Sequence, residues 1–307
     1  MAWNQTPIEI HPDVRAALGS EQPVVALEST IISHGLPRPE NLRVAREVED
    51  RVRQRGAVPA TIAMLDGVVQ IGLSDAQLVD VAMRDDITKV GVRDLPIVAA
   101  RMGSGATTVA ATSHLANLCG IPLFATGGLG GVHRDARESW DESADLTTLG
   151  TVPVTVVCSG VKSILDVRAT LERLETLNVG VVGYQTNTFP GFYLTSSGFE
   201  LDWMAADPSE IADIIRMRSA LNITSALVVA VPLSENDQLD PDLHDAVLAE
   251  GLTLADRRGI TGKQVTPFLL DHFHRSTHGA SLQVNERIII QNADIAARIA
   301  VAHRLLP

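Results

Sequence analysis

The chain has 307 residues, of which 45% are hydrophobic and only 4% aromatic, and it carries a formal net charge of −12. The acidic balance excludes nucleic-acid binding through a basic footprint, but it leaves room for a small phosphorylated ligand held by a few local donors. Cys119 and Cys158 form neither a disulfide framework nor a metal-binding spacing, which suits a reducing compartment. The N-terminus lacks a signal-peptide pattern and no apolar run reaches membrane-spanning length, so we expect a cytoplasmic protein.

Apolar runs rich in valine and isoleucine alternate with segments of helical periodicity in the first half of the chain. The Asp66-Gly67 pair is a strong hairpin signal, and Ser74 and Gln77 form a capping box. The predicted elements are a strand over 24–32, a helix over 39–55, hairpin strands over 60–65 and 68–73, a short helix from 74, a strand around 87–90, a helix over 107–118 and a strand over 121–126.

The same alternation continues in the second half. It predicts a strand over 153–158, a helix over 162–177, strands over 179–184 and 226–231 with a helix from 207 between them, and a wholly helical region from 240. Such alternation implies a mostly parallel, partly mixed central sheet covered on both faces. No repeat or linker divides the chain, so we expect residues 1–307 to form a single-domain α/β/α sandwich with a helical C-terminal region.

Lysine is scarce: among 25 basic residues only Lys89, Lys162 and Lys263 are lysines. Lys162 follows a predicted buried strand and is predicted to open a helix, at the sheet edge where open α/β folds bind ligands. The helix dipole and partial burial would both disfavour an ammonium ion there, which leaves an amine able to form an imine. A charged Lys162 that contacts a phosphate or carboxylate is an equally weighted alternative.

Glu28 lies at the end of the apolar run 24–27, where a carboxylate is costly unless it is paired or protonated. A raised pKa would suit a general acid or base, whereas the commoner outcome for a lone buried glutamate is an ion pair with an arginine. The hydroxyl-rich segment 29–35 that follows favours a polar pocket over a core.

Two further segments are candidates for ligand binding. The glycine-rich stretch 127–131 follows a strand, and its backbone N–H groups could hold an anion, although a plain turn is the simpler interpretation. Asp141 and Asp145 would share one face if helical, and oxygen ligands favour Mg²⁺ or Mn²⁺ over zinc, although many acidic pairs only form a solvated face. The stretch 103–108 lacks the third glycine of a dinucleotide fingerprint and no strand clearly precedes it.

One set of collinear stretches spans nearly the whole chain: 26–35, 59–63, 93–96, 105–110, 124–128, 130–134, 143–146, 162–166, 183–186, 262–263, 266–270 and Asn285. In these stretches the chain closely resembles the pseudouridine-5′-phosphate glycosidase family. The resemblance implies one α/β/α domain, usually a homotrimer, and a glycosidase of the carbon–oxygen lyase class that depends on Mn²⁺. The family reversibly cleaves the C–C glycosidic bond of pseudouridine 5′-phosphate to uracil and ribose 5-phosphate.

The resemblance also implies roles for individual residues. Lys162 would be the nucleophile that holds the opened ribose as an imine, and Glu28 would be the proton donor. The metal would be held by Asp141, with Asp145 close enough to share it. The substrate contacts implied are Lys89, Val109, Ser143, Ala144, Asp145 and Asn285.

The chain departs from the family's pattern at Val90-Gly91-Val92, Ser159, Val161 and Glu142. None of these departures removes a group that the resemblance places in catalysis, but Gly91 and Val92 bear on phosphate affinity. An imine-forming phosphosugar aldolase or lyase acting on another C-glycoside, and a non-catalytic phosphosugar-binding protein, are the alternatives.

Overall fold

A computed structural model describes residues 7–261 and 265–305. Its strands are β1 (Ile8–Ile10), β2 (Val24–Leu27), β3 (Val58–Leu65), β4 (Val68–Ile71), β5 (Thr88–Val90), β6 (Gly105–Thr107), β7 (Leu123–Ala125), β8 (Thr155–Cys158), β9 (Gly180–Tyr184), β10 (Met204–Ala205) and β11 (Leu227–Ala230). They join one sheet in the order β1-β4-β3-β2-β7-β8-β11-β9-β10, with β6 paired to β3 and β5 to β6. Among the described strands, the antiparallel pairs are β3 with β4 and β3 with β6, so the sheet is mostly parallel and partly mixed, as predicted.

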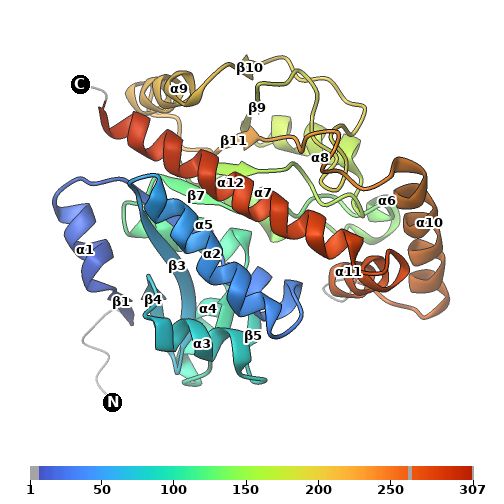
Figure 1. The fold of residues 1–307 in the computed structure, drawn as a ribbon, viewed down its shortest axis with the longest axis horizontal. Helices are drawn as coiled ribbons and strands as arrows, with labels where there is room; N and C mark the ends of the chain where they lie inside the picture. The colour runs from blue at the N-terminus through green and yellow to red at the C-terminus, as the bar shows by residue number, and fades with distance from the viewer. Residues whose placement is uncertain (1–6, 262–264, 306–307) are drawn as a thin grey trace.

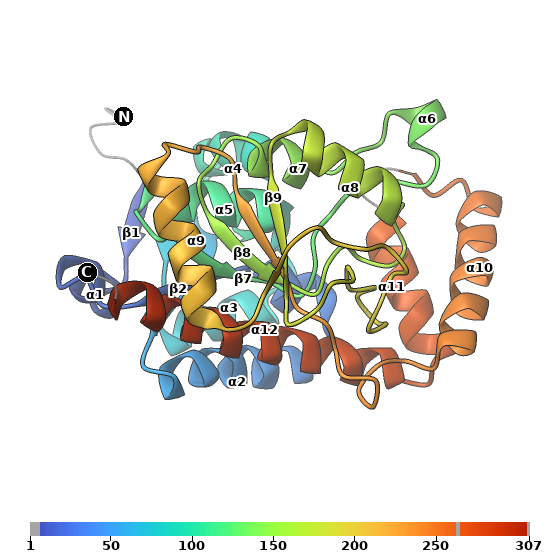
Figure 2. The same ribbon diagram turned by 90° about the horizontal axis from the view of Figure 1, so that it is seen from above.

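Helices cover both faces of this sheet (Figures 1 and 2). The helices are α1 (Pro12–Gly19), α2 (Glu40–Gln54), α3 (Asp75–Met83), α4 (Leu95–Ala100), α5 (Val109–Leu118), α6 (Ala136–Ser139), α7 (Ala144–Leu149), α8 (Val167–Thr176), α9 (Pro208–Ala220), α10 (Pro241–Arg257), α11 (Val265–Ser276) and α12 (Ala280–Leu305), with a π-helix over Ile31–Gly35 and a 3₁₀ turn over Val92–Asp94. Figure 2 shows α2 and the long α12 on one side of the strands, with α5, α7 and α8 on the other. The described chain therefore has the predicted single-domain α/β/α fold, and its C-terminal region is helical.

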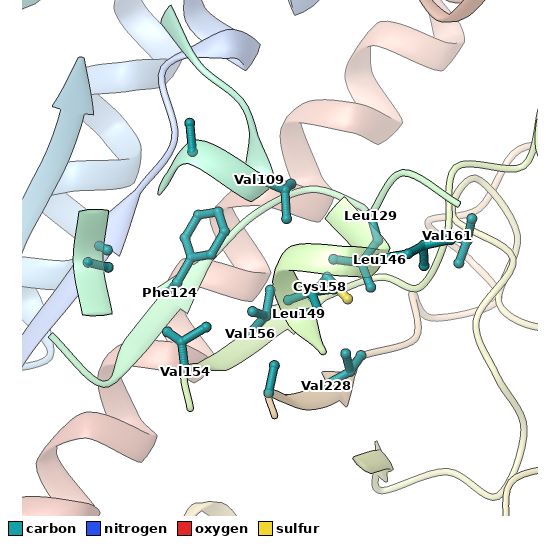
Figure 3. Packing of buried hydrophobic residues seen from close by; sticks show 14 of the residues in the cluster. Val109, Phe124, Leu129, Leu146, Leu149, Val154, Val156, Cys158, Val161 and Val228 are labelled. Atoms are coloured by element: carbon teal, nitrogen blue, oxygen red, sulfur yellow. The ribbon is translucent and has the colours of Figure 1, made fainter. Parts of the chain in front are cut away.

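The strands alternate their side chains between two apolar layers. Val25 and Leu27 of β2 pack towards α2 and α12, while Val24 and Ala26 pack with the layer beneath α5 and α7. Figure 3 shows this second layer, in which Phe124 of β7 lies beside residues of β8 and α7. Strands buried on both faces read as continuous apolar runs, which explains why the valine-rich segments predicted them well.

Two predicted boundaries were wrong near the carboxyl edge of the sheet. The strand expected over 24–32 ends at Leu27, and the chain then turns into the π-helix over Ile31–Gly35. The helix expected from Lys162 begins only at Val167, because the Asp166 side chain accepts a hydrogen bond from the Ala169 N–H and caps it there. Strands β1, β6 and β10 were not predicted; they have only two or three residues each and give little periodic signal.

No helix within the described ranges is long and apolar enough to span a membrane.

Candidate active site

A pocket of about 820 Å³ opens at the carboxyl ends of β2, β7 and β8, which are neighbours in the sheet. From β2 the chain continues to β3 on one side, and β7 later joins on the other, so the pocket lies where the strand order changes direction. Every site residue predicted from the sequence lines this pocket: Glu28, Lys89, Val109, Asp141, Ser143, Ala144, Asp145, Lys162 and Asn285. Lys263 lies outside the described residues.

Glu28 follows β2 directly and lies beside Thr126, which follows β7 in parallel register. The Thr126 hydroxyl donates a hydrogen bond to the Glu28 carboxylate, whose residue is only 9% exposed. Burial raises the pKa of Glu28 above its ordinary value, and the charge of Lys162 and the Thr126 bond offset part of that rise. No arginine of the described chain pairs with Glu28, so the ion-pair alternative was wrong.

Lys162 lies half-buried in the loop between β8 and α8, and its Nζ donates a hydrogen bond to the Gly128 carbonyl at 2.6 Å. The loop is fastened from outside by Arg134, which donates to the carbonyls of Ser163 at 3.1 Å and Ile164 at 3.3 Å. Because α8 begins five residues later, the helix-dipole part of the sequence argument was wrong. The sheet does bring Lys162 close to Glu28, since the Lys162 charge acts electrostatically on the Glu28 carboxyl.

The glycine-rich stretch 127–131 does not present a free row of amides. The Gly130 N–H donates to Asp145 at 2.8 Å, and the Leu129 N–H donates to the Gly160 carbonyl at 2.9 Å. A Cβ on Gly130 would lie 2.2 Å from the Ser143 hydroxyl, so this glycine is needed for close packing. The anion-cradle hypothesis is therefore wrong for these two amides.

Asp141 and Asp145 do not share a helical face, contrary to the prediction. Asp145 lies in the first turn of α7, whereas Asp141 precedes that helix and follows Trp140, whose φ is 57°. Both Asp145 oxygens accept backbone bonds, from the Ala110 N–H at 2.9 Å and from the Gly130 N–H. Asp145 thus ties α5 and the glycine-rich loop to α7.

Asp141 is better placed than Asp145 to bind a ligand. Its side chain is 30% exposed, and its Oδ2 lies 3.8 Å from Nδ1 of His133, another pocket residue. Within the residues that the structure describes, no group of three or more His, Cys, Asp or Glu side chains is arranged to hold a metal ion. Any cation at Asp141 would have to take most of its ligands from water and substrate.

The hydroxyls of segment 29–35 mainly fasten backbone instead of facing the pocket. Ser29 donates to the Ile62 carbonyl at 2.6 Å and Ser33 to the Val81 carbonyl at 2.8 Å. Thr30 lines the pocket, but its hydroxyl donates to the Thr107 carbonyl at 2.9 Å. The segment does line the pocket, as predicted, although these three hydroxyls donate to backbone carbonyls.

Asn285, on α12, is buried at 6% exposure, and no hydrogen bond joins its side-chain amide to any described residue. Because Asn285 also lines the pocket, its side-chain amide is available to a ligand there. Sequence reasoning missed Phe192, which lines the pocket and packs so closely on Gly128 that a Cβ there would lie 2.7 Å from its ring. The loop 185–203 carried no pattern that singled out Phe192.

Comparison with known proteins defines the class. The sequence model of the family described as "Indigoidine synthase A like protein" matches residues 13–302. The chain is 62% identical over 291 residues to a pseudouridine-5′-phosphate glycosidase of Salinispora tropica, covering 94% of this chain and 90% of the relative. It is 59% identical over 291 residues to the enzyme of that name from Streptomyces griseus subsp. griseus, with the same coverage. The chain belongs to this family, whose relatives carry the name pseudouridine-5′-phosphate glycosidase.

Two solved structures share the fold. The prealnumycin C-glycosynthase AlnA in complex with ribulose 5-phosphate superposes with a TM-score of 0.89 at 33% identity, and the match covers 97% of each chain. An indigoidine synthase A-like protein of Thermotoga maritima gives the same TM-score at 35% identity, and that match covers 99% of each chain.

Proposed function

We propose that this protein cleaves the C–C glycosidic bond of pseudouridine 5′-phosphate reversibly, to give uracil and ribose 5-phosphate. The names of relatives up to 62% identical support this activity, and the neighbouring C-glycosynthase was solved with a pentose phosphate. The observation that carries the proposal is the joint placement of Lys162 and Glu28 at the edge of neighbouring strands, in a pocket lined by the other predicted site residues.

A lysine explains how such a bond can break. The two-carboxylate scheme of ordinary glycosidases protonates a leaving oxygen, and a C-glycoside has none at that position. We propose that the neutral Lys162 amine bonds to C1′ as the C1′–O4′ bond breaks, and that the proton lost by the nitrogen passes to O4′. The nitrogen lone pair then forms the protonated imine as the C–C bond breaks, and the electron pair of that bond stays on the uracil carbon, which takes up a proton. Water hydrolyses the imine, releases ribose 5-phosphate and restores the amine.

Glu28 is suited to supply the proton that the departing carbon needs. Burial raises the pKa of its carboxyl, so the protonated form persists to higher pH than in an ordinary glutamate. In the reverse direction the ionised form would take that proton back as the new C–C bond forms. The Thr126 hydrogen bond orients the carboxyl towards the pocket edge.

Other residues that line the pocket are suited to the phosphosugar. Lys89 on β5 and Arg93 in the 3₁₀ turn line it, and the Ser143 hydroxyl caps α7 nearby. Val109 and Ala144 shape its wall without contributing a side-chain charge. Together these residues would hold a phosphate through charge and short polar contacts.

We further propose that Mn²⁺ binds at Asp141. A hard cation of this type accepts one carboxylate and completes its shell with water and substrate oxygens, which fits the lone, partly exposed Asp141. When bound, the metal would neutralise negative charge on the substrate. Asp145 is less suited to the metal because both its oxygens already accept backbone bonds. We also propose a homotrimer, which the family resemblance implies, and a cytoplasmic location.

The direct test is release of uracil from pseudouridine 5′-phosphate by the purified protein, with and without Mn²⁺. Borohydride added during turnover, or with ribose 5-phosphate alone, should attach the sugar to the peptide that contains Lys162. Absence of uracil release together with binding of ribose 5-phosphate would favour the phosphosugar-binding alternative. Cleavage of a different C-glycoside phosphate only would favour the aldolase or lyase alternative.

A further inference from the structure

A second cavity of about 240 Å³ adjoins the main pocket, and we call it the side pocket. It is lined by Ser33, His34, Gly35, Leu36, Pro37, Tyr193, Pro267, Leu270, Asp271, His274, Ser281, Leu282 and Asn285. Five of these residues also line the main pocket, namely His34, Gly35, Pro267, Leu270 and Asn285. They form the wall between the two spaces.

The side pocket has a polar lining whose groups are incompletely bonded. Nδ1 of His274 is buried without a hydrogen-bond partner, and no hydrogen bond joins the Tyr193 hydroxyl to another described residue. A buried polar group without a partner costs about 1–3 kcal/mol, so such a cavity favours water or a polar ligand group over collapse. The side pocket is therefore usable space behind the wall.

The wall begins beside the residues proposed to react. A Cβ on Gly127 would lie 3.6 Å from Oδ1 of Asn285, a member of the wall, and 3.8 Å from the Phe192 ring, and Lys162 donates its hydrogen bond to the next residue, Gly128. Pro267 and Leu270 add apolar surface to the wall, and Lys89 is close enough to act electrostatically on His34. With C1′ at Lys162, the group attached at C1′ would lie within reach of the wall. This step depends on the proposed function.

We propose that His34 limits the size of the aglycone (the group attached at C1′), and that the side pocket is the space into which a larger aglycone extends when this side chain is removed. The π-helix over Ile31–Gly35 carries His34, which lines both cavities and is an exposed residue. Within the described ranges its ring makes no hydrogen bond. Removing it should therefore enlarge the aglycone end without disturbing the fold.

The other members of the wall are less suited to this role. Asn285 is a proposed substrate contact, and Gly35 has no side chain to remove. Pro267 and Leu270 belong to the first half of α11, where truncation would also alter the packing of that helix. His34 is the member whose side chain can be shortened at the least structural cost.

The experiment compares His34→Ala with Asp271→Ala, a control residue that lines only the side pocket. Substrates are pseudouridine 5′-phosphate and its derivatives with methyl, propyl or benzyl groups on uracil N1 or N3, and base release gives kcat/KM. In wild type, each enlargement of the substituent that no longer fits should lower kcat/KM by about 10- to 200-fold, a range typical of steric pockets. His34→Ala should reduce that discrimination at least about tenfold at one position, and His34→Phe should increase it.

Unchanged discrimination in His34→Ala at both N1 and N3 would overturn the proposal, as would an equal change in Asp271→Ala. If His34→Ala folds but loses its activity on every substrate, the proposal is also overturned, because His34 would then take part in the reaction itself. Failure of the proposed function is distinguishable, since wild type would then release no uracil from the parent substrate.

Discussion

Replacing Glu28 by glutamine separates the catalytic use of this carboxyl from its structural cost. Glutamine keeps the shape of the side chain and can still accept the Thr126 hydrogen bond, but it cannot donate a carboxylic proton. A positioned general acid contributes about 10²- to 10⁴-fold to a rate, so we expect kcat to fall by that factor. Uracil release under saturating substrate measures it, and the pH profile of wild type should decline as pH rises through the raised pKa of Glu28.

The same substitution should increase stability at neutral pH. Because the folded pKa of Glu28 is raised above 4.5, its contribution to stability is fully present below that value and is lost as pH rises through the folded pKa. Glutamine never ionises, so Glu28→Gln should be more stable than wild type at pH 8 and should lose this pH dependence.

Glu49 offers a matched control. It is also buried, at 6% exposure, and accepts a hydrogen bond from Thr61 at 2.6 Å, but it is paired with Arg53 at 2.7 Å. Glu49→Gln should lower stability, because it removes the partner of a cation, and should leave uracil release intact. The reasoning is refuted if Glu28→Gln retains wild-type turnover, or if thermal unfolding at pH 8 shows it to be the less stable protein.

Three further predictions concern neighbouring groups. Lys162→Arg keeps the charge but cannot form an imine, so turnover and borohydride trapping should both vanish; residual turnover near wild type would disprove the nucleophile role. Asp145→Ala leaves the Ala110 and Gly130 N–H groups without their acceptor and should cost about 2–5 kcal/mol in denaturant unfolding, whereas a loss under about 0.5 kcal/mol would contradict the tether. Asp141→Asn should weaken Mn²⁺ binding measured by electron paramagnetic resonance at least about tenfold, and unaltered binding would place the metal elsewhere.

Local signals in the sequence predicted much of the fold. The Asp66-Gly67 pair does form the hairpin turn, with φ of 49° and 84°, and the Ser74–Gln77 capping box does open α3. These features depend on neighbouring residues alone, so one sequence suffices to place them. Local signals also predicted that Lys162 follows a buried strand, whereas the strand before Glu28 was predicted to continue to residue 32.

Features that depend on tertiary contacts were not predictable in this way. The glycine-rich loop is occupied by Asp145, a residue fourteen or more positions away, so its amides looked free from the sequence alone. Helix α8 begins only at Val167, capped by Asp166, because both the Lys162 N–H and its side chain are bonded to carbonyls of the glycine-rich loop, those of Leu129 and Gly128. Phe192 reaches the pocket from a loop without periodicity, and only the folded chain identifies it.

The order of the strands explains why the proposed chemistry needs this particular arrangement. β2, β7 and β8 come from distant parts of the chain but lie side by side, so Glu28, Thr126 and the Lys162 loop meet at one edge. Glu28 must stay protonated long enough to donate, which burial favours, yet the nearby cationic form of Lys162 lowers its pKa. In the proposed mechanism Lys162 must lose its proton before it can attack C1′, and that opposing charge is then gone. Loss of this proton would itself raise the pKa of Glu28, which couples the activation of Lys162 to the protonation of the base.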